Sequence, residues 1–111
     1  MSRNGLLIDY EYCTGCHSCE VACRNEHNIP RGKWGIKLTE VGPWQVNGEE
    51  WEWDYIPVPT VLCDLCKERV AKGEKPSCVH HCLGQAMEYG TLEELAKKME
   101  SKGKKVALFI P

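Results

Sequence analysis

The chain has 111 residues, enough for one small domain, which we expect to span residues 1–111. Lys and Arg (14) nearly balance Asp and Glu (16), which argues against a nucleic-acid-binding protein with a basic stripe. No apolar run approaches the roughly 18 residues that cross a bilayer, so direct membrane insertion is not expected. Eight residues are cysteine and residues 1–5 show no apolar signal segment, so we expect metal-binding cysteines in a cytoplasmic protein. Export together with a signal-bearing partner stays open.

The elements before and between the cysteines are short. Residues 5–10 predict a strand, and Cys19 to His27, which contains neither Gly nor Pro, predicts one or two helical turns. Asn47-Gly48 lies between alternating apolar residues, the strongest short signal of a β-hairpin. We place this hairpin at about residues 36–57, within a spacer of residues 28–62. Its apolar face is expected to carry three tryptophans, Trp44, Trp51 and Trp53, which either supply core or cover a partner subunit.

The last part of the chain, residues 91–111, predicts a helix followed by a strand. Thr91 and Glu94 have the spacing of a capping box, and apolar residues at helical spacing follow them. Gly103 is expected to end this helix, and residues 106–110 predict a terminal strand.

The first four cysteines have the spacing C-x2-C-x2-C-x3-C. They are Cys13, Cys16, Cys19 and Cys23. This is the run of the bacterial ferredoxins, in which three cysteines bind one [4Fe–4S] cluster and the fourth binds the other. Three thiolates two residues apart can wrap a tight loop around one corner of a cluster, with backbone N–H groups directed inward. Gly15 relaxes the steric limits of that turn.

The second four cysteines follow the same plan with one gap widened by an inserted loop, residues 67–77. Exchange of the fourth cysteine between the two stretches gives two sites of four, with no cysteine left over. Cluster A would then be bound by Cys13, Cys16, Cys19 and Cys82, and cluster B by Cys23, Cys63, Cys66 and Cys78. We therefore predict two [4Fe–4S] clusters in an α+β fold, a small ferredoxin-like domain with an inserted β-hairpin and a C-terminal helix and strand.

Other uses of the cysteines fit the pattern less well. Zinc sites of four thiolates typically show two C-x2-C pairs, not a triplet at two-residue gaps. A disulfide framework would need an export signal, and no cysteine stands apart as a catalytic thiol. The four histidines, His17, His27, His80 and His81, replace no missing cysteine, so they are interpreted as neighbours of the clusters or as exposed groups.

The two cysteine stretches resemble motifs of the iron–sulfur electron-transfer subunits that serve dimethyl-sulfoxide-reductase-type molybdopterin enzymes. The resemblance covers residues 63–82, with Arg69, Gly73 and Pro76 between the cysteines, and residues 13–27. Family members usually carry four cysteine motifs, and this chain looks like the first and the last with the middle pair absent. The family usually has Pro after the final cysteine, where this chain has Leu83.

The resemblance implies an electron-transfer subunit without a catalytic site of its own. It would relay single electrons between a soluble carrier and a large catalytic subunit that depends on molybdopterin or tungstopterin, with cluster A on the pterin side. The alternatives are a free-standing dicluster ferredoxin, the small subunit of a tungsten aldehyde-oxidoreductase-type enzyme, and a redox-sensing or structural module. The loop with Lys67, Arg69, Lys72 and Lys75 either holds an acidic partner or is a solvated surface loop.

Overall fold

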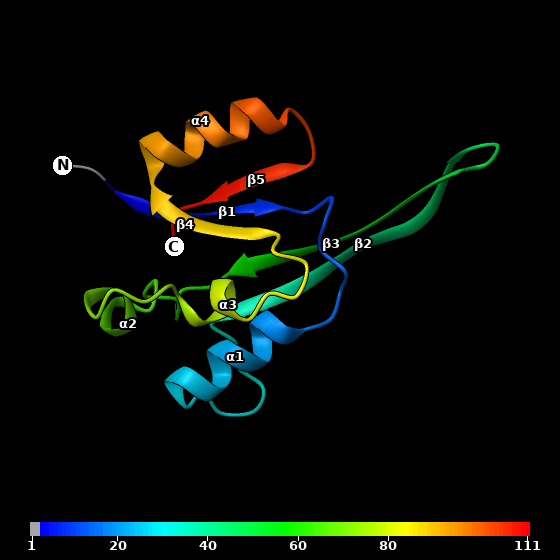
Figure 1. The fold of residues 1–111 in the computed structure, drawn as a ribbon. Helices are drawn as coiled ribbons and strands as arrows, with labels where there is room; N and C mark the ends of the chain where they lie inside the picture. The colour runs from blue at the N-terminus through cyan, green and yellow to red at the C-terminus, as the bar shows by residue number, and fades with distance from the viewer. Residues whose placement is uncertain (1–2) are drawn as a thin grey trace.

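A computed structural model describes residues 3–111, so the first two residues of the expected domain lie outside the described part. Its elements follow in chain order: β1 (Asn4–Asp9), α1 (Ser18–His27), β2 (Ile36–Asn47), β3 (Glu50–Pro59), α2 (Lys67–Ala71), α3 (Ser77–His80), β4 (Met87–Thr91), α4 (Leu92–Lys102) and β5 (Val106–Phe109). The strands form a three-stranded antiparallel sheet of order β4-β1-β5 and a separate hairpin of β2 and β3 (Figure 1). No helix of the described chain is long and apolar enough to cross a membrane. This small mixed α/β fold is compatible with a ferredoxin-like domain.

The three-stranded sheet separates α4 from the cysteine-bearing segments, which lie on its two sides (Figure 1). Its central strand, β1, is buried on both faces. Leu6 and Ile8 join the core that holds three of the cysteines, while the alternate residue Asp9 is bound by Lys102 of α4 at 3.0 Å. Burial of each such leucine or isoleucine contributes roughly 1.5–3 kcal/mol, which makes β1 the main apolar element of a small core.

The C-terminal helix and strand are present where the sequence predicts them. The Thr91 hydroxyl caps α4 by accepting a hydrogen bond from the Glu94 backbone N–H at 3.3 Å. Gly103 follows the helix with a φ of 87°, a conformation that glycine adopts without steric cost. The chain then returns as β5 along β1.

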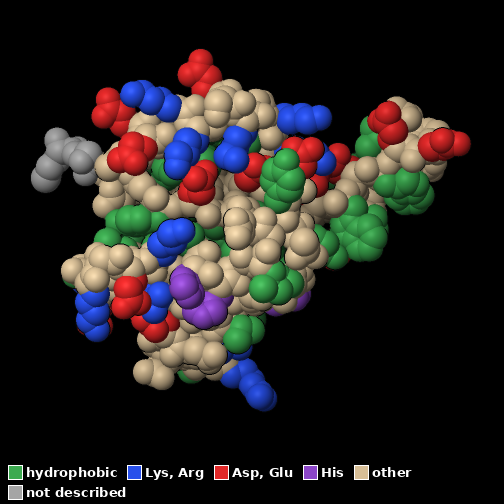
Figure 2. Space-filling view, viewed as in Figure 1, with side chains coloured by type: hydrophobic (Ala, Val, Ile, Leu, Met, Phe, Trp, Pro, Cys, Tyr) green, Lys and Arg blue, Asp and Glu red, His purple; other side chains and the backbone are tan. Residues whose placement is uncertain are grey.

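The hairpin is also present, with a register that differs from the expected one. Asn47 pairs with Glu50, so Gly48 and Glu49 form the turn instead of Asn47-Gly48, and β3 continues to Pro59. Ile36 and Leu38 at its base are buried, whereas its outer half projects from the body of the molecule (Figures 1 and 2).

The expectation that three tryptophans share one face of the hairpin is wrong. Trp44 pairs with Glu52, and Trp51 pairs with Gln45. Paired residues of two antiparallel strands lie on the same face, and neighbours along a strand lie on opposite faces. Trp51 and Trp53 therefore share one face, and Trp44 lies on the other.

Three short elements have no counterpart in the sequence-based prediction. The loop expected at residues 67–77 contains the five-residue helix α2 and leads into the four-residue helix α3. β4 covers only five residues and completes the sheet beside β1. Segments of this length hold too few residues to show a period, and their structure depends on tertiary contacts.

Candidate metal centres

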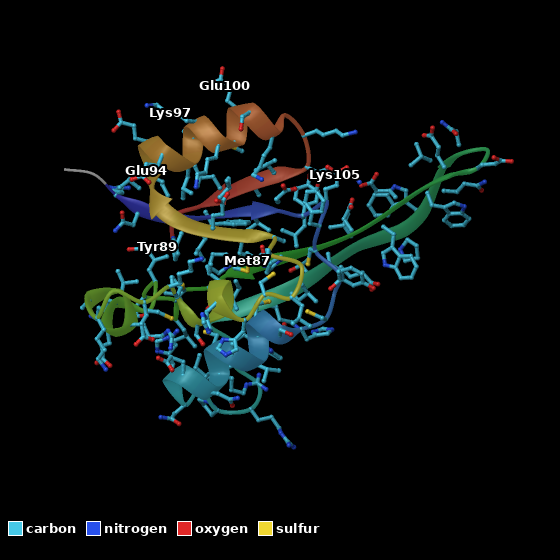
Figure 3. All side chains as sticks on the ribbon, viewed as in Figure 1. Met87, Tyr89, Glu94, Lys97, Glu100 and Lys105 are labelled. Carbon is cyan, nitrogen blue, oxygen red and sulfur yellow. The ribbon has the colours of Figure 1, made fainter. Side chains whose placement is uncertain are left out.

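Four cysteines from both halves of the chain line one pocket beneath the three-stranded sheet. They are Cys13, Cys16, Cys19 and Cys82, called cysteine group A below. The rest of the wall is mainly apolar: Leu38 and Pro57 come from the hairpin base, and Met87 projects from β4 toward α3 (Figure 3). Apart from the exposed Cys16, the members of group A are half-buried or buried.

The remaining four cysteines form a second set of neighbours, called cysteine group B. They are Cys23, Cys63, Cys66 and Cys78. Burial is the largest cause that raises the pKa of Cys78, and the nearby thiols of Cys66, Cys23 and Cys63 raise it further. Cys19 of group A also acts on Cys78, so the two groups adjoin.

Two packed helices distribute their cysteines between the groups. α1 carries Cys19 into group A and Cys23, one helical turn later, into group B. α3 carries Cys78 into group B, and Cys82, just beyond its end, returns to group A. α1 and α3 pack against each other. The structure therefore brings together the same two sets of four that the spacing predicts, while their role as ligands stays a prediction.

The arrangement of the sulfurs differs from that around a single ion. Among residues 3–111, no three His, Cys, Asp or Glu side chains are gathered as ligands of one metal ion. The four thiolates of a cubane cluster each bind a different iron, so they surround a larger group without meeting at one point. The eight thiols in two sets of four fit that donor requirement.

Backbone N–H groups are directed at most of the cysteine sulfurs. The N–H of Ala86 lies 3.3 Å from the Cys82 sulfur. Backbone hydrogen bonds of the same kind favour the thiolate at six other positions, Cys13, Cys16, Cys19, Cys23, Cys63 and Cys66. Such donors compensate the negative charge that thiolates and sulfides bring into a low-dielectric site.

Burial alone keeps several of these thiols protonated. It raises the pKa of Cys19 to about 12 and that of Cys23 to about 11, with neighbouring acids and thiols adding to the effect for both residues. Cys16 differs, since hydrogen bonds from the hydroxyl and N–H of Ser18 lower its pKa to about 7. A buried thiolate needs a cation beside it, so these sites suit positively charged iron and would release protons on binding it.

The loops around the cysteines contain unusual backbone conformations. Four non-glycine residues there have positive φ angles between 50° and 64°: His17, Leu65, Cys66 and Gln85. Gly15 has a φ of 76°, and a Cβ atom at this position would lie 2.9 Å from the ring of Tyr55 in β3. Residues in sparsely populated conformations cluster at functional sites, where the surrounding structure holds them in place.

The structure gives two of the histidines specific partners. His27 Nε2 lies 3.1 Å from the Cys66 sulfur, a contact that sequence reasoning left undecided. Its signal was present, because His27 follows Cys23 by one turn of α1. His17 is not directed at a sulfur: its Nδ1 lies 2.6 Å from the carboxylate of buried Glu20.

Glu20 ties α1 to the hairpin base. Its carboxylate accepts the backbone N–H of Leu38 at 2.7 Å, with Lys37 at 3.7 Å. Burial favours the neutral acid, but the hydrogen bonds from His17 and Leu38 outweigh it, so the pKa of Glu20 is lowered. The next residue after Glu20 lies between the two cysteine groups, and this anchor fixes the helix that supplies one cysteine to each group.

Comparison with known proteins supports an iron–sulfur subunit. No family model matches the chain. The probable anaerobic dimethyl sulfoxide reductase chain YnfG of Escherichia coli is 31% identical over 93 residues, which cover 84% of this chain and 34% of that protein. The menaquinone reductase iron–sulfur cluster-binding subunit of Nitratidesulfovibrio vulgaris is 37% identical over 87 residues, 70% of this chain and 30% of that protein. The chain is a homologue of the iron–sulfur subunits of dimethyl-sulfoxide-reductase-type enzymes.

This chain spans about a third of the length of several of these relatives. A subunit of the polysulfide reductase of Wolinella succinogenes aligns over 97% of this chain and 93% of its own length, with 22% identity. That alignment has 178 positions against the 111 residues of this chain, so the relative contains a long stretch without a counterpart here. This agrees with the interpretation that the middle motifs of the family are absent.

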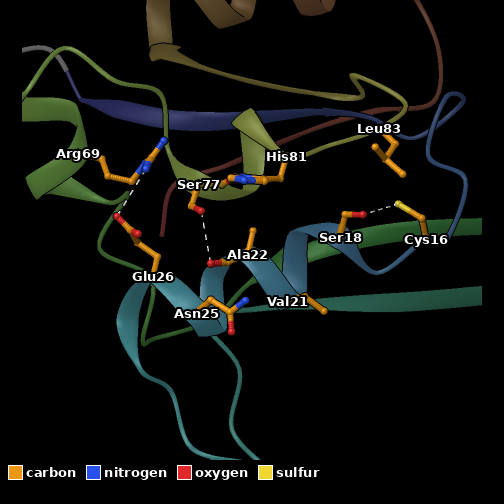
Figure 4. A pocket seen from close by; sticks show the side chains of 10 residues that line it. All are labelled: Cys16, Ser18, Val21, Ala22, Asn25, Glu26, Arg69, Ser77, His81 and Leu83. Atoms are coloured by element: carbon orange, nitrogen blue, oxygen red, sulfur yellow. Dashed lines mark hydrogen bonds and ion pairs between the residues drawn. The ribbon is translucent and has the colours of Figure 1, made fainter.

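Leu83 has a structural consequence at the position where the family usually has Pro. Its backbone N–H hydrogen-bonds the Cys16 sulfur and helps to lower the pKa of that thiol. Proline has no N–H, so it would remove this donor from group A. The leucine side chain is 76% exposed at one end of a groove of about 480 Å³ along α1 (Figure 4).

The same groove contains Arg69, one of the basic residues in the predicted positive loop. Its guanidinium lies 3.7 Å from Glu26 and 3.1 Å from Glu74 (Figure 4 shows the first pair). These two carboxylates neutralise Arg69, whose side chain is mostly buried. The positive charge that this loop offers a partner therefore comes from its exposed lysines, Lys67, Lys72 and Lys75.

Proposed function

We propose that this chain is an electron-transfer subunit that holds two [4Fe–4S] clusters and passes electrons between an external carrier and a pterin-dependent catalytic subunit. The observation that carries the proposal is the pair of cysteine groups with backbone N–H groups directed at their sulfurs. Homology to iron–sulfur subunits of reductases supports the same function. A protein of the cytoplasm, as the composition suggests, would suit the external carrier.

The roles of the residues follow from their positions. Group A would hold cluster A and group B cluster B, and each cluster supplies one-electron chemistry when bound. The chain's own contribution is to bind the clusters, to exclude water with residues such as Leu38 and Met87, and to donate hydrogen bonds to sulfur. Because Cys19 and Cys78 are close enough to influence each other, the two clusters would be neighbours, as a relay requires.

The catalytic partner is inferred from the relatives. Reductases of dimethyl sulfoxide, polysulfide and tetrathionate name proteins similar to this chain, and each of these names designates one chain or subunit of a larger enzyme. Among the described residues, no pocket combines paired carboxylates or a nucleophile with a base, so the substrate chemistry would belong to the partner.

Single cysteine variants test the exchange between the two halves of the sequence. Cys13→Ala and Cys82→Ala should damage the same cluster, and Cys23→Ala and Cys78→Ala the other, each lowering the iron content to about half. Electron paramagnetic resonance of the anaerobically reduced proteins should therefore sort the four variants into these two pairs. The wild type should show the signal of two interacting clusters.

Two outcomes would contradict the proposal. Matching spectra for Cys78→Ala and Cys82→Ala would mean that each half of the sequence forms its own site. Two zinc ions and no visible absorption in the wild type would exclude iron–sulfur clusters altogether. Measuring iron, zinc and acid-labile sulfide on the same samples separates these outcomes.

A further inference from the structure

The outer part of the hairpin, residues 40–55, is called the arm below; it extends away from the rest of the molecule (Figure 2). Trp51 and Trp53 on the arm are 62% and 57% exposed. A two-stranded ribbon alone in water is only marginally stable, and exposed tryptophans are typical anchors of protein interfaces. The arm therefore has the properties of a surface that another molecule covers.

One face of the arm carries a prearranged row of aromatic rings, Trp51, Trp53 and Tyr55, called the aromatic row. The indole N–H of Trp53 donates to Glu40 at 2.8 Å, and the hydroxyl of Tyr55 donates to the same carboxylate oxygen at 3.2 Å. The two rings lie 6.2 Å apart between centroids. Because these side chains are already held, covering them costs less conformational entropy than ordering free ones.

The aromatic row reaches cysteine group A. Its inner end, Tyr55, contacts Gly15 in the loop between Cys13 and Cys16 so closely that a Cβ on Gly15 would lie 2.9 Å from the ring. A protein that covers the row therefore also meets this loop, where Cys16 is the most exposed of the cysteines. The surface is thus continuous with the part of the molecule where a cluster in group A would be accessible.

The charge of the arm indicates the chemistry of its partner. The arm contains five acidic residues and no Lys, Arg or His. Asp54 is paired with Lys105, whereas Glu49 and Glu50 are exposed at the tip (Figure 2). Two copies of this chain joined through the same face would bring like charges together, which is unfavourable. A fitting partner has an apolar groove with lysines and arginines around it.

We propose that the aromatic row is the docking surface for the pterin-dependent catalytic subunit, which receives it in an apolar groove with a basic rim. This rests on the proposed function and adds where the partner binds: on the Trp51 and Trp53 face, next to group A, and not on the Trp44 face or beside group B.

The test uses the tagged full-length chain, produced in its native host and purified anaerobically at low salt. The wild type should carry a polypeptide that contains the pterin cofactor and molybdenum or tungsten. Trp51→Ser/Trp53→Ser should lower the recovered pterin per tagged chain about tenfold or more. Trp44→Ser, on the opposite face, should leave it unchanged. Both variants must keep the wild-type iron content and visible spectrum, because the substituted side chains are exposed.

Charge reversal gives an independent measurement at the tip. Glu50→Lys should weaken the complex at low salt, whereas Glu100→Lys on α4, which changes the net charge equally, should not (Figure 3 shows Glu100). A benzophenone side chain at Gln45, which pairs with Trp51, should cross-link to the pterin-containing polypeptide.

Three results would overturn the inference. Wild-type amounts of pterin enzyme on Trp51→Ser/Trp53→Ser would remove the aromatic row as the docking surface and leave the proposed function standing. A wild type that carries no pterin enzyme and reduces none would overturn the proposed function and this inference with it. A dimer of the purified chain in sedimentation, lost in the double variant, would assign the aromatic row to self-association.

Discussion

His27 is the side chain whose contact with a candidate ligand is most direct. Its Nε2 lies 3.1 Å from the Cys66 sulfur and 4.0 Å from the nearest Asp64 carboxylate oxygen. A thiolate bound to iron has no proton, so the hydrogen bond in a loaded protein must be donated by the imidazole ring. Donation to sulfur stabilises the reduced cluster, which carries more negative charge, and so raises its potential.

Replacing His27 by Phe should therefore lower the potential of one cluster. If the hydrogen bond is about 1 kcal/mol stronger in the reduced state, the shift is about 40–50 mV for one electron. A redox titration followed by electron paramagnetic resonance resolves the two clusters and should show the change in cluster B alone. His81→Phe is the matched control, because its Nδ1 faces the Ser77 carbonyl and not a sulfur. An equal shift of both clusters in His27→Phe would contradict a direct hydrogen bond.

At the scale of elements, the base of the hairpin covers the first cysteine loop. Gly15→Ala should damage cluster A, because the residue has a positive φ and its new methyl group would meet Tyr55. The backbone conformation alone costs about 1–2 kcal/mol, and the clash adds to it. Iron content falling to about half, with the cluster B signal kept, is the expected result. Gly73→Ala is the control, since that residue has a φ of 83° but no atom within 4 Å of the added methyl.

Loss of iron in Gly73→Ala equal to that in Gly15→Ala would show that backbone strain, and not the contact with Tyr55, controls the cluster. Gly48→Ala completes the set, because it lies in the hairpin turn with neither a positive φ nor a near neighbour. That variant should behave as the wild type does.

Elements with strong local signals could be predicted from the sequence. The capping pair Thr91 and Glu94 marked α4, and the Asn47-Gly48 signal marked the hairpin. The exact turn could not be predicted, because pairing of Asn47 with Glu50 depends on irregularities further along the ribbon. Cysteine spacing predicted which thiols meet. The contacts of His27 and Tyr55 could not be predicted, since each joins residues about 40 apart in the sequence.

At the scale of the whole molecule, charge is distributed unevenly around the two cysteine groups. The acidic arm adjoins group A, whereas the lysines of residues 67–77 follow directly after Cys66 of group B. Surfaces of opposite sign select partners of opposite sign and accelerate their encounter. The two ends of the proposed relay thus differ in the partners they would attract.

The position of the arm relative to the sheet depends in part on one ion pair. Asp54 in β3 is buried and lies 3.1 Å from Lys105 Nζ, at the segment that leads into β5 (Figure 3). A hydrogen bond from Glu52 and the charge of Lys105 hold the pKa of Asp54 below its ordinary value, although burial opposes this. The same pair raises the pKa of Lys105.

The signs of these shifts define a pH range for the stabilisation. Asp54 contributes above the pKa of an unfolded aspartate, about 4, and its contribution is lost as the pH falls through the lower folded pKa. Lys105 contributes below its unfolded pKa, about 10, and loses its effect as the pH rises through the higher folded value. Asp54→Asn should therefore lower the melting temperature between about pH 4 and pH 10, and least at the acidic end. Glu52→Gln, which keeps a hydrogen-bond donor for Asp54, is the control that should change stability less. A melting-temperature difference between wild type and Asp54→Asn that is as large at about pH 3 as at pH 7 would show that the ion pair is not its cause.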